Sequence, residues 1–224
     1  MKQIKTLYID GSRIKSGGGI QHLQEILRSN KLSYFDEIII FSYSELELKL
    51  KDTNDKIIFR TNYLINKNIL TCLFWQLFFL KREMKNINSI LLSLDSTTLC
   101  KYKKNIIINQ DIIGFQEKSL QFFKGKSLIY NYFKYLVASR AIKNSFANIF
   151  TTHFAKSLFK NINSENNIVI PHGVDSNILP KVKYNLTENS FFDIVFISPI
   201  LAYKNHSYII AVSYTHLTLP TKRI

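Results

Sequence analysis

Short runs of apolar residues alternate with amphipathic stretches along most of the chain. The runs are continuous and rich in β-branched side chains, a pattern that predicts strands buried on both faces of a parallel sheet. They lie at residues 4–10, 37–42, 56–60, 89–94, 105–109, 148–152 and 167–171.

The stretches between these runs predict helices. Their expected positions are residues 19–29, 45–51, 70–85, 117–124, 128–143 and 153–160. In the region 128–141 the apolar positions recur at helical spacing, at Leu128, Ile129, Tyr132, Phe133, Leu136, Val137 and Ala141. Regular alternation of strand and helix predicts an α/β fold, a Rossmann-like doubly wound parallel sheet.

The pattern changes towards the end of the chain, and it predicts four parts. Residues 1–174 form the first domain, and the polar stretch 175–190, which holds Pro180, is a linker. Residues 191–211 supply a new strand at 193–198 and a helix from His206, as at the start of a second Rossmann-like domain. Residues 212–224 break that helix and resemble translated sequencing adapter, so we expect a non-native tail and a natural protein that continues beyond Ala211. A genuine strand containing a proline is the alternative for the tail.

Composition narrows the class of protein. The chain of 224 residues is 46% hydrophobic and 21% charged, which fits a folded core rather than a disordered protein. Its two cysteines make neither a disulfide framework nor a metal-binding spacing, which fits a reducing cytoplasm. The longest apolar run, residues 69–80, is shorter than the roughly 20 residues that cross a bilayer.

The net charge of +14 indicates anionic partners such as nucleic acid, phosphate-bearing substrates or a membrane surface. The alternative explanation of this charge is compositional drift on solvated faces, because the chain is rich in the residues that an AT-rich genome over-encodes. In the region 118–143, lysines alternate with aromatic residues. This segment fits a helix lying on an anionic membrane, or a core-facing stripe with a solvated lysine face.

A glycine turn follows the first strand. Gly17, Gly18 and Gly19 precede the first helix, where backbone N–H groups can approach an anion. A plain tight turn between strand and helix is the alternative. Neither a dinucleotide-binding G-x-G-x-x-G nor a P-loop is present, and the second strand ends in Phe41-Ser42 rather than an acid that would bind ribose.

Further polar residues follow later strands. Gln110 and Asp111 come directly after the strand 105–109, and Thr151 or Thr152 is positioned to cap a helix that places His153 on the surface. Pro171, His172 and Gly173 form a turn before the linker. There we expect His172 to fix hinge geometry and Gly173 to adopt a backbone conformation that other residues resist.

Together these segments resemble group 1 (family 4) glycosyltransferases of the GT-B fold. The interdomain crossing with its Pro-His-Gly turn carries most of the resemblance, and the glycine turn is similar to the family's first loop. The segment 107–115 resembles a loop of one bacterial branch: Gln110 and Phe115 match it, whereas Asp111, Gly114 and Gln116 depart from it. Lys204 stands near the family's donor-binding Lys, but Ser198-Pro199 replaces the usual Gly-Arg.

The resemblance implies two facing Rossmann-like domains that transfer a sugar from a nucleotide-sugar donor to a glycan or lipid-linked acceptor. It implies retention of anomeric configuration, no metal and no cofactor, in cell-surface polysaccharide or O-antigen biosynthesis. By this resemblance Gly17, Gly18 and Gly19 approach acceptor or phosphate, Gln110 and Asp111 lie beside the sugar, and Lys204 approaches the donor diphosphate. It assigns no catalytic residue to this part of the chain. The full enzyme would be a retaining hexosyltransferase, and we expect this chain to be inactive because most of the donor-binding domain is missing from it.

Relatives that act on lipid-linked sugars associate with membranes, so we expect a cytoplasmic protein, peripheral on the inner face of the membrane. Signatures of DNA or RNA binding are lacking, so no nucleic-acid partner is expected. The alternative function is a non-enzymatic basic α/β module that binds an anionic membrane or nucleic acid.

Overall fold

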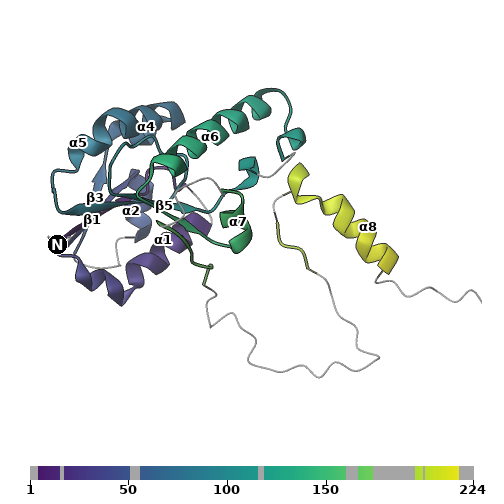
Figure 1. Cartoon of the computed structure of the whole chain (residues 1–224), viewed down its shortest axis with the longest axis horizontal. Coiled ribbons are helices and arrows are strands. Elements are labelled where there is room, and N and C mark those ends of the chain that lie inside the picture. The colour runs from purple at the N-terminus through teal and green to yellow at the C-terminus, as the bar shows by residue number, and fades with distance from the viewer. Residues whose placement is uncertain are drawn as a thin grey trace, which may run out of the picture.

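Seven parallel strands form a single sheet in the computed structural model, which describes residues 5–15, 18–50, 56–115, 119–159, 166–173, 195–198 and 200–216 (Figure 1). The strands are β1 (Thr6–Asp10), β2 (Glu37–Ser42), β3 (Ile57–Thr61), β4 (Ser89–Ser93), β5 (Asn105–Asn109), β6 (Ala147–Phe150) and β7 (Asn167–Val169). Their order is β3-β2-β1-β4-β5-β6-β7, and every neighbouring pair is parallel. The predicted Rossmann-like α/β fold is therefore confirmed, and the seven strands predicted between residues 4 and 171 are all in the sheet.

Helices connect the strands. They are α1 (Gly18–Arg28), α2 (Ser44–Leu50), α3 (Tyr63–Lys67), α4 (Ile69–Trp75), α5 (Lys81–Glu83), α6 (Gly125–Asn144), α7 (His153–Ser157) and α8 (His206–His216). A π-helical turn, η2 (Gln76–Leu80), joins α4 to α5, so the predicted helix 70–85 is a composite of three segments. Short 3₁₀ turns are η1 (Asn30–Tyr34), η3 (Ile113–Phe115), η4 (Ser119–Phe122) and η6 (Ala202–Lys204). The predicted cap of α7 is confirmed, since the Thr152 hydroxyl accepts a bond from the Ala155 N–H at 3.0 Å.

Three predicted features differ from the structure. The helix expected at 117–124 is only the short turn η4, with residues 117 and 118 outside the described part. Residues 195–198 of the expected strand 193–198 form no strand, because none of the seven strands of the sheet pairs with them. Helix α8 continues to His216 instead of ending at Ala211. No glycine or proline interrupts residues 212–216, so the expected break there is wrong. The predicted linker, 175–190, lies outside the described residues.

The core lies around the central strands. Every side chain of β1 is buried, and Ile38–Phe41 of β2 are too, as expected for strands covered on both faces. Trp75 of α4 is fully buried and its ring lies 5.4 Å from that of Phe41. These contacts fix α4 against the sheet.

Helix α6 contributes less to the core than its spacing suggests. Its buried residues are Val137, Ala138 and Ile142, whereas Tyr132 is 51% and Phe133 is 48% exposed. Tyr130, Tyr132 and Phe133 therefore do not form a core-facing stripe, whereas the partly buried Tyr135 ring lies 5.1 Å from that of Phe115. In Figure 1, α6 lies with α4 and α5 above the sheet, and α1 lies below it.

Candidate functional site

A cavity of about 450 Å³ opens where the strand order reverses between β1 and β4. In open α/β sheets this switch point is where ligands bind, beyond the carboxyl ends of the strands. Three loops that follow β1, β4 and β5 line it, together with α1 and α6. The lining residues are Arg13, Ile14, Lys15, Gly19, Leu94, Asp95, Ser96, Gln110, Asp111 and Lys134.

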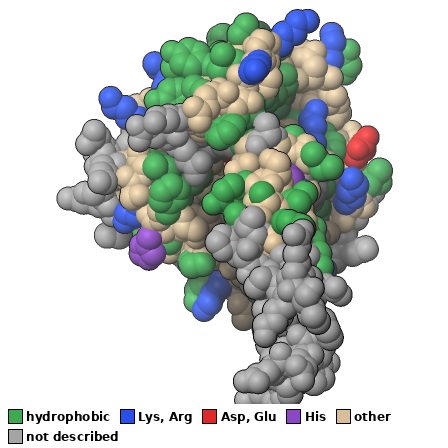
Figure 2. All heavy atoms as spheres, turned by 90° about the vertical axis from the view of Figure 1, so that its right-hand side faces the viewer, with side chains coloured by type: hydrophobic (Ala, Val, Ile, Leu, Met, Phe, Trp, Pro, Cys, Tyr) green, Lys and Arg blue, Asp and Glu red, His purple; other side chains and the backbone are tan. Residues whose placement is uncertain are grey.

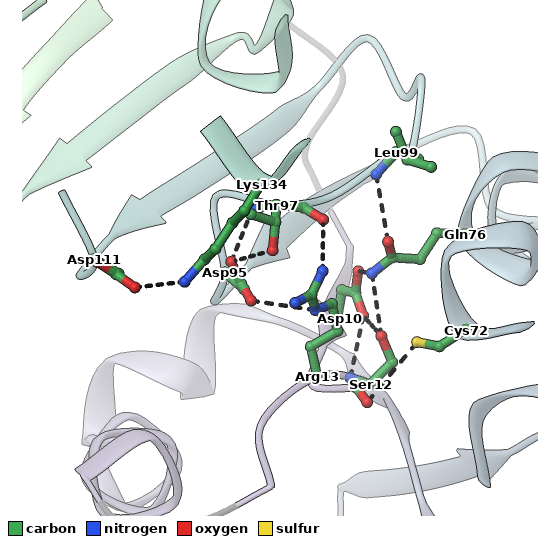
Figure 3. A network of polar contacts seen from close by, with 10 residues as sticks. All are labelled: Asp10, Ser12, Arg13, Cys72, Gln76, Asp95, Thr97, Leu99, Asp111 and Lys134. Atoms are coloured by element: carbon green, nitrogen blue, oxygen red, sulfur yellow. Dashed lines mark hydrogen bonds and ion pairs between the residues drawn. The ribbon is translucent and has the colours of Figure 1, made fainter. Parts of the chain in front are cut away.

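Beneath the cavity, Asp10 ends β1 and is 5% exposed. Its Oδ1 accepts bonds from the Ser12 N–H at 3.1 Å and the Ser12 hydroxyl at 2.5 Å, and its Oδ2 accepts one from Gln76 Nε2 at 2.8 Å (Figure 3). Burial raises the pKa of the Asp10 carboxyl, and it outweighs the Ser12 and Gln76 hydrogen bonds, which lower it. The network holds the start of the β1–α1 loop in one conformation.

Arg13 anchors that loop to the loop after β4. Its Nε lies 3.3 Å from Asp95 Oδ2, and its Nη1 donates to the Thr97 carbonyl at 3.3 Å. Asp95 Oδ1 in turn accepts bonds from the Thr97 N–H at 2.8 Å and the Thr97 hydroxyl at 2.7 Å. The guanidinium is therefore oriented by two partners, and its side chain keeps 12% of its surface exposed.

Lys134 of α6 reaches the cavity from the opposite side. Its ammonium forms an ion pair with Asp111 Oδ2 (Figure 3). Burial alone would lower the pKa of Lys134, but the carboxylates of Asp111 and Asp95 outweigh that effect and raise it. Lys134 therefore stays positively charged at neutral pH.

This arrangement suits a ligand rich in hydroxyl groups that also carries negative charge. Asp95 and Asp111 keep 30% and 48% of their side-chain surface exposed, so their oxygens can accept bonds from hydroxyl groups. Arg13, Lys15 and Lys134 supply donors and positive charge. Among the described residues no cluster of three or more His, Cys, Asp or Glu side chains could hold a metal ion.

The structure brings several predicted site residues together. Gly19, Gln110 and Asp111 line the same cavity although more than 90 positions separate the first from the others. Gly18 begins α1, and a Cβ built there would meet open space. Gly17 lies outside the described residues.

The predicted hinge and donor residues lie elsewhere. The His172 ring packs edge-on against His22 of α1, with the ring centres 5.4 Å apart. Burial of His22 lowers its pKa, and the nearby charge of His172 lowers it further. Pro171 and Gly173 are exposed, and Gly173 lacks the positive φ that we expected. Lys204 does not line the cavity, and its ammonium lies 5.3 Å from the ring centre of Tyr203.

Sequence reasoning missed the charged residues that organise the site. Asp10 is the last residue of the first predicted strand and Asp95 directly follows the strand predicted at 89–94, positions that mark polar residues at the carboxyl edge of a parallel sheet. Nothing in the local sequence except the neighbouring glycines marks Arg13 as a site residue. Lys134 could not be told apart from the other lysines of its helix. Gln76 was hidden in an apolar helix.

Comparison with known proteins adds no relative: no protein-family model, curated protein or solved structure matches the chain. In the part of the chain that the structure describes, every helix is too short or too polar to cross a bilayer.

Proposed function

We propose that this chain forms the acceptor-side domain of a glycosyltransferase that moves a sugar from a nucleotide-sugar to a glycan or lipid-linked acceptor. The cavity at the β1–β4 switch point is the observation that carries the proposal. It combines exposed carboxylates with cations, and three of the residues that the family resemblance singles out, Gly19, Gln110 and Asp111, line it. Assembly of cell-surface polysaccharide is the setting that the resemblance suggests.

The residues of the cavity suit the demands of sugar transfer. Carboxylates such as Asp111 would accept bonds from sugar hydroxyls and fix the acceptor in place, and positioning alone lowers a barrier substantially. The cations Arg13 and Lys134 would stabilise the negative charge that develops on a leaving diphosphate. Their existing ion pairs hold both groups in orientation before a ligand arrives.

Ligand binding tests this proposal directly. Purified chain would be titrated, with NMR or calorimetric detection, with methyl glycosides, sugar phosphates and nucleotide-sugars. We expect saturable binding of a sugar or sugar phosphate, weakened about tenfold by Asp111→Asn, because one charge-assisted bond is lost. The matched control is Glu45→Gln, an exposed carboxylate of α2 outside the cavity.

Absence of sugar binding, or equal effects of Asp111→Asn and Glu45→Gln, would contradict the proposal. The alternative, a non-enzymatic module on an anionic membrane, is favoured by the exposed aromatic residues of α6. That function needs no sugar binding, so vesicle binding that persists unchanged in Asp111→Asn without any sugar binding would support it.

A further inference from the structure

An apolar groove runs between α4 and α6 on the outer side of the sheet. Its first part, a hollow of about 70 Å³, is lined by Ile69, Leu70 and Leu73 from α4 and by Tyr130, Phe133 and Val137 from α6. Leu70 is 70% and Phe133 is 48% exposed, so these apolar side chains face solvent. Exposed apolar side chains gathered along a groove mark a binding surface.

The groove continues along α6. A second hollow of about 510 Å³ lies between the loop residues 98–103 with Leu77 of η2 on one side and Val137, Arg140, Ala141 and Asn144 of α6 on the other. Val137 lines both hollows, and the lining positions of α6 recur every three or four residues, so they share one face of the helix. At a rise of about 1.5 Å per residue, the groove extends about 15 Å from Lys134 to Asn144.

The groove meets the polar cavity at one end. Arg13 and Lys134 line both the cavity and the first hollow, so two cations lie at the end of the apolar groove that meets the cavity. The second hollow is bordered by Lys101, Lys103 and Arg140, and no acidic residue lines either hollow among the residues described. Figure 2 shows hydrophobic side chains interspersed with Lys and Arg over the helical layer at the top of the molecule.

We propose that this groove binds the hydrocarbon chain of an anionic lipid whose phosphate lies between Arg13 and Lys134. The proposal rests on the proposed function and narrows its acceptor to a lipid phosphate or lipid-linked sugar. A hydrocarbon chain would remove the exposed side chains of α4 and α6 from water. Its phosphate would use N–H donors of Arg13 and Lys134 other than those that, among the described residues, bind Asp95, Thr97 and Asp111. The sugar end would then point into the cavity beside Asp95 and Asp111.

Calorimetry with three small probes tests this proposal without any sugar donor. Octyl phosphate carries both features, octyl glucoside carries the chain without charge, and inorganic phosphate carries the charge without the chain. We expect octyl phosphate to bind saturably at one site below its micelle concentration, at least about tenfold more tightly than either other probe, since both halves of the site contribute.

Two variants separate the contribution of the apolar groove from that of the two cations. Phe133→Gln removes apolar contact, so octyl phosphate should bind at least about fivefold more weakly while inorganic phosphate is unaffected. Lys134→Gln should bring octyl phosphate close to the affinity of octyl glucoside. The control is Leu48→Gln, which changes an exposed apolar residue (69%) of α2 that lines neither hollow, and it should leave the affinity for octyl phosphate unchanged. Circular dichroism melting verifies that each variant is folded.

Unsaturable binding, equal affinity for the charged and neutral octyl probes, or equal effects of Phe133→Gln and Leu48→Gln would overturn the proposal. If the chain still binds sugar in that case, the glycosyltransferase proposal holds and the acceptor is a soluble glycan. Saturable octyl phosphate binding without any sugar binding would instead keep the lipid site and remove the glycosyltransferase.

Discussion

The carboxylate of Asp10 shows how single side chains organise this molecule. It lies inside the protein at the end of β1, and bonds from Ser12 and Gln76 hold it in place. These bonds link the first loop of the site to the helical segment above the sheet. The same burial raises the pKa of Asp10, so its protonation is coupled to folding.

Replacing Asp10 by Asn should therefore change how stability depends on pH. Because the native pKa is raised above the ordinary 3.8, the native state binds more protons than the unfolded chain in the range just above 3.8. Stability contributed by Asp10 is complete below that value and is lost as the pH rises through the native pKa. Urea unfolding from about pH 4 to pH 7 should show wild type losing stability relative to Asp10→Asn. A difference between the two proteins that stays constant with pH would refute the assignment.

The glycines at the start of α1 offer a second single-residue test. A side chain at Gly18 meets open space and the residue has no positive φ, so Gly18→Val should change the unfolding free energy by less than about 0.5 kcal/mol. Binding of the sugar ligand should nevertheless weaken about tenfold if the loop approaches it.

For comparison, a Cβ at Gly19 would lie 3.0 Å from Ile14 Cγ2, so Gly19→Ala must displace the Ile14 side chain and should raise the unfolding free energy by less than the roughly 1 kcal/mol that Ala gains over Gly in an open helix. Unchanged ligand affinity in Gly18→Val would separate this loop from the site.

The segment α4–η2–α5 joins the core to the candidate site. Trp75 secures it to the sheet, and the π-helical turn begins with the buried Gln76. The Gln76 amide donates to Asp10 at 2.8 Å, and its carbonyl accepts from the Leu99 N–H at 3.3 Å. An amide at this position thus connects the loops after β1 and β4, and π-helical turns often occur beside functional sites.

Substituting Gln76 by Met would keep the volume and remove the hydrogen bonds of the amide to Asp10, Ser12 and Leu99. Asp10 Oδ2 and the Leu99 N–H would lose their amide partner in the interior, so we expect destabilisation of about 1–3 kcal/mol, measured by urea unfolding. The control Gln24→Met changes a half-buried glutamine of α1 outside the cavity and should have little effect. Equal stability of Gln76→Met and wild type would show that the bridge contributes nothing.

The molecule as a whole has a net charge of +14, and several aromatic side chains of α6 are about half exposed. Electrostatic attraction draws such a protein to anionic surfaces, and apolar side chains can then insert among the lipids. Either contribution alone would be weak. Their presence on one helical layer suggests that they act together.

Vesicle binding should therefore depend on both lipid charge and salt. We expect the chain to cosediment with vesicles containing phosphatidylglycerol and not with vesicles of phosphatidylcholine alone. Raising salt from about 0.1 M to 1 M shortens the screening length from about 10 Å to 3 Å, so most of the protein should be released. Equal sedimentation with both vesicle types would mean that the basic surface has no part in membrane binding.

Local pattern was sufficient to predict the sheet. All seven strands were predicted because continuous β-branched runs bury themselves between two helical layers wherever they occur in an alternating chain. The helix 128–143 and the Thr152 cap were predictable for the same reason, since spacing and capping act over a few residues. Gln110 and Asp111 were singled out by the resemblance of the segment 107–115 to a glycosyltransferase loop, and the structure places both in the lining of the cavity.

Long-range contacts settled the rest. Arg13 and Asp95 meet across 82 positions, and Lys134 reaches Asp111 across 23, so no local pattern could reveal either pair. The burial of α6 could not be predicted from the sequence either. Its spacing predicts a helix, but how many neighbouring residues cover that helix depends on where α4 lies. Periodicity reports the shape of one element, whereas pairing, burial and pKa depend on elements brought together by folding.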